Sequence, residues 1–314
     1  MINVTIIGFG TVGSSLLLLL LNNKQAIRLN VMEPNDQREG AFLDFSHSMS
    51  LYSNKELIVN DEDLFNDSDF IFYTAGIPNI HGVSRLSIAG KNIQLTKELF
   101  KGRKFNKTPY VVAITNPVDI ISHALCQFSE LPADHVVGTG TFLDSVRLAY
   151  YLSTLSDYKA DDFDPYVLGE HGESQFGAYS FTKVKGTNIL CCDEFSAETL
   201  ITAEKLTRNA AFQIRETQKG TTYAVSKCAE VIMNSLLDKE AHRFPLSMLT
   251  NKYFNSLLQL DRSIYISMPA EISAQGIKIV SDIQLTEAEL RSYRKSAEIL
   301  AAITKLELSL EVPP

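Results

Sequence analysis

The sequence predicts an α/β protein in which an N-terminal doubly wound parallel sheet is followed by a C-terminal α+β domain. Short β-branched, apolar runs alternate with helical stretches through residues 1–139, which is the pattern of a parallel sheet covered by helices. A glycine-rich turn stands between the first such run and its helix. From about Gly140 helical stretches dominate, so we assign residues 140–314 to a second domain.

The N-terminal elements are predicted from apolar runs bounded by polar, Gly or Pro residues. A leucine run from Leu16 to Leu21 resembles the core of a signal peptide. No Lys or Arg precedes it, however, and Asn22-Asn23-Lys24 follows where a small-residue cleavage site should be, so we predict a buried helix. Strands are expected at residues 2–7, 27–32, 69–74, 110–114 and 135–138, and longer helices at 11–22 and 87–105.

The C-terminal half is predicted to hold longer helices with strands between them. No Gly/Ser/Pro-rich linker separates the halves, so we expect the second domain to pack tightly on the first, with a cleft between them. Helices are expected at residues 142–155, 197–216, 221–237 and 286–305, and strands at 179–184, 188–190, 263–268 and 276–280.

Composition narrows the class of protein. The 29 Lys and Arg residues against 37 Asp and Glu residues give a formal net charge of −8, which argues against a nucleic-acid partner. The few cysteines lack the paired CxxC spacing of a zinc site and favour a reducing compartment. We therefore expect a cytoplasmic protein that binds neither membrane nor metal. The cysteines are Cys126, Cys191, Cys192 and Cys228.

Residues 8–13 read GFGTVG and fit the pattern G-x-G-x-x-G between a predicted strand and a predicted helix. Gly8 would allow the tight turn, Gly10 would let backbone N–H groups approach a pyrophosphate, and Gly13 would let the helix pack on the strand. The helix N-terminus favours the charge of a phosphate. The predicted phosphate-binding residues are Gly8, Gly10, Thr11, Val12 and Gly13.

An acidic residue at the end of the next strand is the second sign of a dinucleotide site. Glu33 ends the predicted strand 27–32, and its carboxylate can accept hydrogen bonds from the adenine ribose hydroxyls. The carboxylate would repel a 2′-phosphate, so we predict NAD rather than NADP. Parallel strands end at one edge of a sheet, so residues at the carboxyl ends of later strands should join this site. These residues are Thr74, Ala75, Gly76 and Asn116.

Four charged residues could assemble a site for a 2-oxo acid. Asp144 and Arg147 are three positions apart on a predicted helix and share a face. Arg85 follows the GVS segment, and His171 stands between glycines in GEHG. Reduction of a carbonyl by NADH needs a fork for the carboxylate, a proton donor for the forming alkoxide, and a group that polarises the carbonyl. Two arginines and a His–Asp pair are suited to these tasks.

The chain resembles the NAD-dependent L-lactate/malate dehydrogenases along essentially its whole length. The matching motifs are GFGTVG, TAGIPNIHGVSRL, ITNPVDI, GTGTFLDSVR and LGEHGESQF, in the family's order. The segments NPVD, LDSVR and GEHG are most similar to those of lactate dehydrogenases and related L-2-hydroxyacid dehydrogenases. The resemblance implies reversible reduction of pyruvate to L-lactate with NADH, by a homodimer or homotetramer.

The resemblance also implies roles for the charged residues. His171 would give a proton to the substrate oxygen, and Asp144 would orient its imidazole and favour the charged form. Arg147 would bind the substrate carboxylate bidentately. Arg85 would polarise the substrate carbonyl from a mobile loop, residues 77–84, that closes over the substrate.

Three further substrate or cofactor contacts follow from the resemblance. Asn116 would contact the nicotinamide ribose and the substrate oxygen, before a cis bond to Pro117. Thr221, in preference to Thr222, would face the substrate. Asn79 stands where lactate dehydrogenases have glutamine and malate dehydrogenases have arginine; without an arginine, oxaloacetate is disfavoured. Because Asn is shorter than Gln, 2-oxo acids larger than pyruvate could also fit.

Fructose 1,6-bisphosphate activates many bacterial lactate dehydrogenases through an arginine and a histidine. In this chain the corresponding positions are Ala149 and Asp164. An aspartate would repel the phosphates of the sugar. We therefore predict that this sugar bisphosphate does not activate the protein.

Other functions remain open at this point. Tyr-x-x-x-Lys, typical of short-chain dehydrogenases, occurs at residues 179–183 and 223–227, but about one chance match is expected among 12 tyrosines. Glu170, His171 and Glu173 could bind a hydrolytic metal, yet no HExxH motif accompanies them. Within the family, a broader 2-hydroxyisocaproate-type enzyme ranks second and a malate dehydrogenase third. An NAD-binding module with a decayed site is the non-enzyme alternative.

Overall fold

The computed structural model describes residues 1–35, 38–77, 85–218 and 220–307, with the backbone alone at residues 85–88 and 307. Contacts divide the chain into two compact units. Unit 1 comprises Met1–Gly138 together with Thr222–Leu237, and unit 2 comprises Thr139–Thr221 together with Asp238–Pro314. One helix from the C-terminal half of the sequence therefore packs in unit 1.

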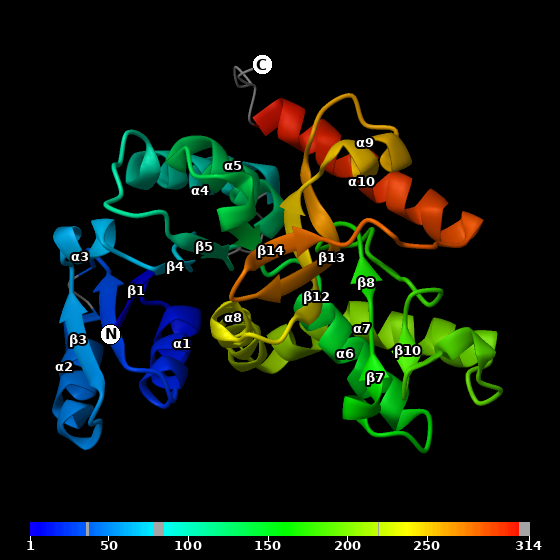
Figure 1. Ribbon diagram of the computed structural model, residues 1–314, viewed down its shortest axis with the longest axis horizontal. Coiled ribbons are helices and arrows are strands. Elements are labelled where there is room, and N and C mark those ends of the chain that lie inside the picture. The colour runs from blue at the N-terminus through cyan, green and yellow to red at the C-terminus, as the bar shows by residue number, and fades with distance from the viewer. Residues whose placement is uncertain (36–37, 78–84, 219, 308–314) are drawn as a thin grey trace. The chain divides into compact units, whose positions relative to one another are not determined.

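Unit 1 is built on parallel strands in the order β6-β5-β4-β1-β2-β3 (Figure 1). β1 is central, because Val4 pairs with Leu29 of β2 on one side and with Phe70 of β4 on the other. This order confirms the predicted doubly wound sheet. The strands are β1 (Ile2–Ile7), β2 (Ile27–Met32), β3 (Lys55–Val59), β4 (Phe70–Tyr73), β5 (Tyr110–Ala113) and β6 (Val136–Gly138).

The leucine run near the N-terminus forms a helix on this sheet, as predicted. Leu16, Leu17 and Leu20 are fully buried, whereas Leu18 is 50% exposed. Leucine is a strong helix former, so one run serves both helix formation and core packing. The helices of unit 1 are α1 (Thr11–Leu21), α2 (Glu39–Ser48), α3 (Glu62–Asn66), α4 (Arg85–Phe100), α5 (Val118–Ser129) and α8 (Tyr223–Leu237), with short 3-10 turns at Met49–Leu51 and Ala133–His135.

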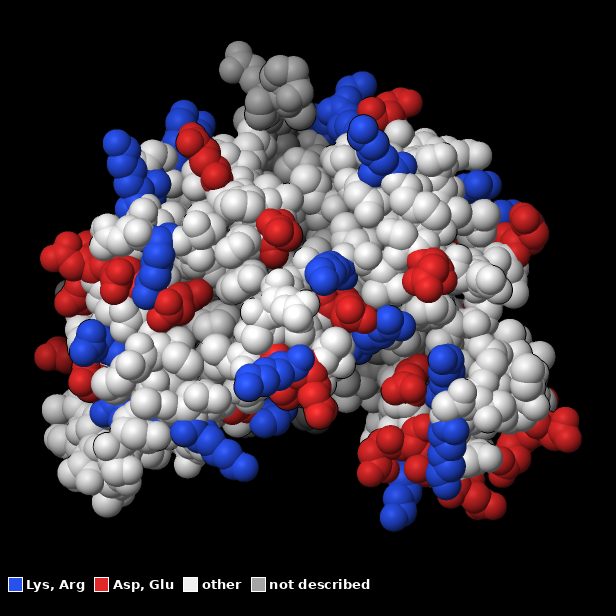
Figure 2. All heavy atoms as spheres, viewed as in Figure 1, with Lys and Arg blue, Asp and Glu red and all other residues white. Residues whose placement is uncertain are grey.

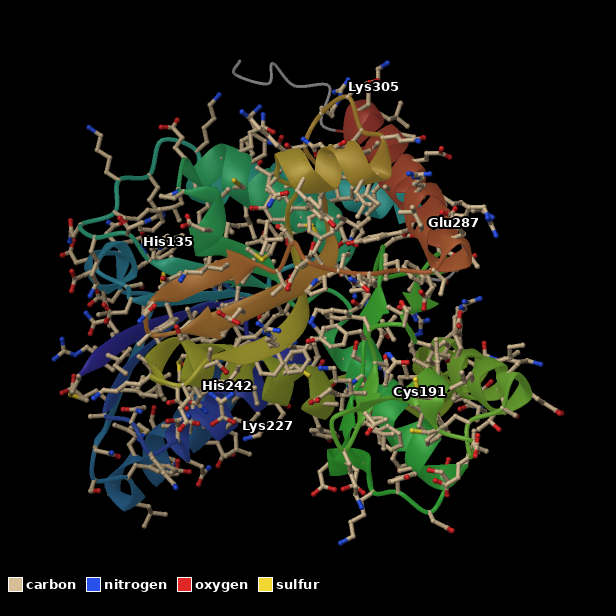
Figure 3. All side chains as sticks on the ribbon, turned by 45° about the vertical axis from the view of Figure 1, so that its right-hand side comes forward. His135, Cys191, Lys227, His242, Glu287 and Lys305 are labelled. Carbon is tan, nitrogen blue, oxygen red and sulfur yellow. The ribbon has the colours of Figure 1, made fainter. Side chains whose placement is uncertain are left out.

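Helix α8 packs along α1 although about 200 residues separate them in the sequence. Asn23, just after α1, donates from Nδ2 to Glu230 Oε1 at 2.8 Å. Ser226 Oγ donates to the carbonyl of Val12 at 3.2 Å. Lys227 lies on α8 (Figure 3) and pairs with Glu230 at 2.7 Å. The bonds of Asn23 and Ser226 therefore hold α1 against α8 near both of its ends.

Unit 2 combines helices with antiparallel strands, as predicted for an α+β domain. β12 pairs with β13, and β13 pairs with β14 (Figure 1). The strands are β7 (Phe163–Asp164), β8 (Val167–Leu168), β9 (Phe176–Gly177), β10 (Lys183–Val184), β11 (Thr187–Asn188), β12 (His242–Leu249), β13 (Tyr265–Ser273) and β14 (Gly276–Ile279). The helices are α6 (Phe142–Thr154), α7 (Ala197–Thr217), α9 (Lys252–Leu258) and α10 (Glu287–Glu307), with 3-10 turns at Ala160–Asp162 and Ile189–Cys191.

Several predicted boundaries are wrong for identifiable reasons. The strand expected at residues 188–190 ends at Asn188, the last residue of β11, and a 3-10 turn follows, because the Asn188 side chain accepts from the N–H of Leu190 at 3.0 Å and starts that turn. The helix expected to reach residue 105 ends at Phe100, and Gly102 then takes a left-handed φ of +76°. β12 was missed because it contains Pro245, which pairs with Pro269 of β13.

The surface is polar, whereas the cores of the two units are apolar. Charged side chains of both signs are spread over the face in view in Figure 2. Helix α2 has no buried residue, which explains why its sequence shows no apolar face to predict it by. In the described part of the chain, no helix has the length and apolar character needed to cross a membrane.

Candidate active site

The turn after β1 has the geometry that the glycine pattern predicts. Gly8 has a φ of +91°, and a Cβ there would lie 2.7 Å from the Cα of Ala75. At Gly13 a Cβ would lie 2.1 Å from the carbonyl oxygen of Gly8, so only glycine lets α1 approach the strand this closely. Thr74 supports the same turn, because its Oγ1 donates to the carbonyl of Gly8 at 2.8 Å.

Gly10 and the start of α1 form an open backbone surface. Among the described atoms, none lies within 4 Å of the Cβ position of Gly10. Gly10 is the N-cap of α1, without a side-chain cap, and Thr11 and Val12 begin the helix. The first N–H groups of a helix have no partner within it, and the helix dipole favours an anion there. This surface fits the pyrophosphate of NAD.

Glu33 stands at the carboxyl end of β2, as predicted, and its carboxylate reaches the glycine turn. Oε2 accepts the backbone N–H of Phe9 at 2.8 Å, and Oε1 accepts that of Asn35 at 3.1 Å. Asn60 binds the backbone of Glu33 through both its amide atoms, at 2.8 and 3.0 Å. Each carboxylate oxygen can accept more than one hydrogen bond, so a ribose hydroxyl can still be bound.

Asn92 joins the segments after β4 and β5 and was missed by sequence analysis. It is fully buried on α4; its Oδ1 accepts the N–H of Ile77 at 2.8 Å and its Nδ2 donates to the carbonyl of Asn116 at 3.0 Å. The bond between Asn116 and Pro117 is cis, as expected. A Cβ at Gly76 would lie 2.4 Å from Thr115 Cγ2. A polar residue within a helix gives no sequence signal of such a link.

His171 and Asp144 meet in unit 2 as predicted. His171 Nδ1 lies 2.6 Å from Asp144 Oδ2. The side chain of Asp144 is 3% exposed and that of His171 is 25% exposed, so the imidazole covers the carboxylate. A carboxylate only accepts hydrogen bonds when ionised, so Nδ1 carries the proton of this bond.

Arg147 binds the second oxygen of the same carboxylate. Its Nη1 donates to Asp144 Oδ1 at 3.0 Å, and its Nη2 donates to Thr221 Oγ1 at 3.1 Å. Burial works to raise the pKa of Asp144, but His171 and Arg147 outweigh burial and hold this pKa below its ordinary value. The carboxylate therefore stays ionised between the imidazole of His171 and the guanidinium of Arg147. Thr222, the alternative to Thr221, is buried.

Two local features aim the histidine segment at α6. Ser145 Oγ accepts the N–H of Val167 at 2.8 Å, which ties β8 to the first turn of α6 beside Asp144. Gly169, directly after β8, has a φ of +97° and forms an isolated bridge with Ser267. Sequence analysis gave Ser145 no role, because only packing on β8 reveals it.

Two predicted site residues have no described side chain. Asn79 lies outside the described residues, and Arg85 is described only by its backbone, as the first residue of α4.

In the alternative Tyr-x-x-x-Lys strings, Tyr179 donates to the carbonyl of Leu200 at 2.7 Å, and Tyr223 is 72% exposed. Within the described ranges, His, Cys, Asp and Glu form no group of three or more that could hold a metal ion.

Sequence comparison matches both halves of the chain to one family. The model of the NAD-binding domain of lactate/malate dehydrogenases matches residues 2–138, and that of their α/β C-terminal domain matches residues 141–310. L-lactate dehydrogenase 1 of Enterococcus faecalis is 32% identical over 308 residues, covering 96% of this chain and 92% of that protein.

Solved structures agree on the fold. The minor L-lactate dehydrogenase of Enterococcus mundtii has a TM-score of 0.87 and 27% identity, covering 96% of this chain and 97% of its own. Malate dehydrogenase of Plasmodium falciparum also has a TM-score of 0.87, at 24% identity, covering 98% of this chain and 99% of its own. Because the two domain models together span nearly the whole sequence, this chain belongs to the lactate/malate dehydrogenase family and is an NAD-binding oxidoreductase.

Proposed function

We propose that this protein is an L-lactate dehydrogenase, which interconverts pyruvate and L-lactate with NADH and NAD. The observation that carries the proposal is the buried Asp144 carboxylate, shared by the imidazole of His171 and the guanidinium of Arg147. One ionised residue therefore binds both the proton donor and the guanidinium that would bind the substrate carboxylate. Reduction of a 2-oxo acid requires both of these groups. The LDSVR and GEHG motifs and the L-lactate dehydrogenase relatives support the same assignment.

His171 is the proton donor in this proposal. NAD supplies the hydride chemistry when bound, and the protein supplies the proton and the orientation of the substrate. His171 in its charged form gives the Nε2 proton to the forming alkoxide, and takes it back in lactate oxidation. Asp144 keeps the Nδ1 proton in place and stabilises the imidazolium that the reaction needs.

Arg147 binds the carboxylate of the substrate. A guanidinium carries five N–H groups in a rigid plane. The bonds to Asp144 and Thr221 set the orientation of that plane and leave further N–H groups for a bidentate carboxylate. The bond from Arg147 Nη2 to Thr221 Oγ1 supports the assignment of Thr221, rather than Thr222, to the substrate side.

The remaining site assignments follow the family motifs. Arg85 polarises the carbonyl of the substrate. Asn116 contacts the nicotinamide ribose and the substrate oxygen. Glu33 binds the adenine ribose, and the glycine turn binds the pyrophosphate. The bonds that Asn92 makes to the segments around Ile77 and Asn116 support a common site for these residues of unit 1.

Pyruvate is preferred over oxaloacetate in this proposal. Residues 77–84 read IPNIHGVS and contain no arginine to pair with a second carboxylate. An unpaired charge in a closed site is costly, so a malate-type activity is disfavoured. Asn79 at the specificity position favours a broader 2-hydroxyacid dehydrogenase as the second candidate, because a shorter side chain leaves room for a longer substrate.

A panel of 2-oxo acids tests this assignment. The purified protein is assayed for NADH oxidation with pyruvate, 2-oxoisocaproate, phenylpyruvate and oxaloacetate. We expect kcat/KM for oxaloacetate to be roughly 100-fold or more below that for pyruvate, because the second carboxylate has no partner. A higher kcat/KM for 2-oxoisocaproate than for pyruvate would favour the broader enzyme, and oxaloacetate as best substrate would refute the proposal.

We further propose that fructose 1,6-bisphosphate does not activate the enzyme. Ala149 is buried in the apolar core of unit 2 and offers no hydrogen-bond donor, and Asp164 presents an exposed carboxylate on β7. Neither side chain can bind a phosphate. Pyruvate saturation curves measured with and without the sugar bisphosphate should superimpose; a leftward shift with the sugar contradicts this proposal.

A homodimer or homotetramer completes the proposal. In unit 1, Leu43 on α2 is 56% exposed and Leu51, just after it, is 82% exposed. Large apolar side chains grouped on one exposed segment are typical of an interface. We assign this segment to contact with a second copy of the chain. Light scattering on the purified protein should give a mass at least twice the monomer mass of 35.0 kDa. The double variant Leu43→Asp with Leu51→Asp should have a lower measured mass.

A further inference from the structure

The segment that carries His171 is held by a ring of hydrogen bonds that includes α10. Ser296 on α10 is fully buried, and its Oγ accepts the backbone N–H of Glu170 at 2.7 Å. The same Oγ lies 2.9 Å from Ser174 Oγ. Ser174 Oγ in turn donates to the carboxylate of Glu170. The ring therefore begins and ends on the residue directly before His171.

The chemistry of the groups sets the direction of this ring. An ionised carboxylate only accepts, so the single hydroxyl proton of Ser174 points to Glu170. Ser174 Oγ must then accept from Ser296, whose own oxygen is left to accept the backbone N–H. Each member donates once and accepts once, so loss of any one member leaves its neighbours without their partners.

Helix α10 is itself anchored against the same segment. Glu287 begins this helix and Lys305 lies in its last turn (Figure 3). Tyr293 donates from its hydroxyl to the carbonyl of Ser267 at 2.8 Å, and the N–H of Ser267 donates to the carbonyl of Gly169 at 3.1 Å. A Cβ at Gly169 would lie 2.7 Å from Ser296 Oγ. The backbone of Gly169 therefore lies directly against the Ser296 side chain of the helix.

We propose that Ser296 and Ser174 are positioning residues for proton transfer by His171. The proposal rests on the proposed function. Asp144 holds the imidazole from its Nδ1 side, whereas the serine ring holds the backbone from which the imidazole projects. Both restraints are needed to place Nε2, and a misplacement of about 1 Å in a catalytic group can lower turnover roughly 100-fold.

The kinetic test uses variants at both serines and a matched control on the same helix. Ser296→Ala should lower kcat roughly 10- to 100-fold, with the dissociation constant of NADH unchanged within about twofold. Ser174→Ala should lower kcat in the same direction, and Ser174→Thr, which keeps the hydroxyl, should restore it. Ser292→Ala should match the parent protein, because Ser292 Oγ bonds to the carbonyl of Ala288 in its own helix.

A purely structural role for these serines predicts a different result. Ser296→Ala would then lower the midpoint of thermal unfolding yet keep the parent kcat at 25 °C, and that outcome overturns the proposal. Should Ser296→Ala fail to fold, Ser174→Ala decides, since Ser174 is only partly buried. An unchanged kcat in Ser174→Ala would then overturn it.

A second readout separates this proposal from the proposed function. Amide hydrogen exchange at Glu170, measured in the absence of substrate, should become at least about tenfold faster in Ser296→Ala and stay unchanged in Ser292→Ala. Failure of the parent protein to reduce any 2-oxo acid overturns the proposed function, while the exchange rates still decide whether the ring holds the segment. Unchanged exchange in Ser296→Ala overturns the ring.

Discussion

The glycine turn of unit 1 and the histidine segment of unit 2 reach fixed geometries by different means. The turn is mainly local, because Gly13 approaches the carbonyl of Gly8 within six residues of sequence, with one further approach of Gly8 to Ala75. The histidine segment depends on side chains far apart: His171 binds Asp144 across 27 positions, and Arg147 binds Thr221 across 74. Changes in the turn should therefore affect NAD binding and folding first, whereas changes around His171 should affect turnover first.

The largest effect on turnover should come from His171→Asn. Asn can keep a hydrogen bond to Asp144 but cannot donate a proton at this site, so kcat for pyruvate should fall roughly 10³- to 10⁴-fold. The dissociation constant of NADH, measured by fluorescence titration, should stay within about twofold of the parent value. Loss of NADH binding together with turnover would show that His171 serves folding instead, and would break the comparison.

Asp144→Asn should have the next largest effect on turnover. The amide keeps the shape but removes the charge that favours the imidazolium, so kcat should fall roughly 10²- to 10³-fold. KM for pyruvate should rise as well, because Arg147 loses its ionised partner. A kcat equal to that of the parent protein would contradict the role given to this carboxylate.

The same substitution predicts a change in acid stability. The pKa of Asp144 is lowered in the folded protein, so its stabilising effect is complete above the unfolded value of about 4 and is lost as pH falls through the folded value. The free energy of unfolding should therefore fall less steeply below about pH 4 in Asp144→Asn than in the parent. Urea unfolding at several pH values measures both slopes; parallel slopes would contradict the lowered pKa.

Gly13→Ala tests the local character of the glycine turn. The new Cβ would lie 2.1 Å from the carbonyl of Gly8, so α1 must move, at a cost of about 1–3 kcal/mol in the free energy of unfolding. NADH binding should weaken while the Asp144–His171 pair is preserved. Gly40→Ala is the matched control, since nothing described lies within 4 Å of its Cβ position. Equal stability of the two variants would refute the close-packing argument.

Thr221→Val should give the smallest effect. Valine keeps the volume but cannot accept from Arg147 Nη2, at a cost of about 1 kcal/mol in orientation of the guanidinium. KM for pyruvate should rise about fivefold, with kcat within about twofold of the parent value. Thr222→Val provides the comparison between the two neighbouring threonines; a larger rise in KM there would reverse the assignment.

Sequence patterns predicted those features whose cause is local. The alternation of apolar runs and helices predicted the parallel sheet, and α1 and β2 match their expected residues to within one position. Patterns failed where a side-chain hydrogen bond decides the outcome. Asn188 turned an apolar stretch into a 3-10 turn through its side chain, and the burial of Asn92 depends on strands that end beside α4.

The sequence by itself determined the dinucleotide turn, the pairing of Asp144 with Arg147 along one helix face, and the family. Glycine readily adopts backbone angles that other residues avoid, and residues three or four positions apart share a helix face. Both features can be read from the sequence. Only the tertiary structure decided that Asp144 is buried between His171 and Arg147, and that Ser296 closes a ring behind the histidine. Burial and long-range hydrogen bonds arise when separate elements pack, and no stretch of sequence contains both partners.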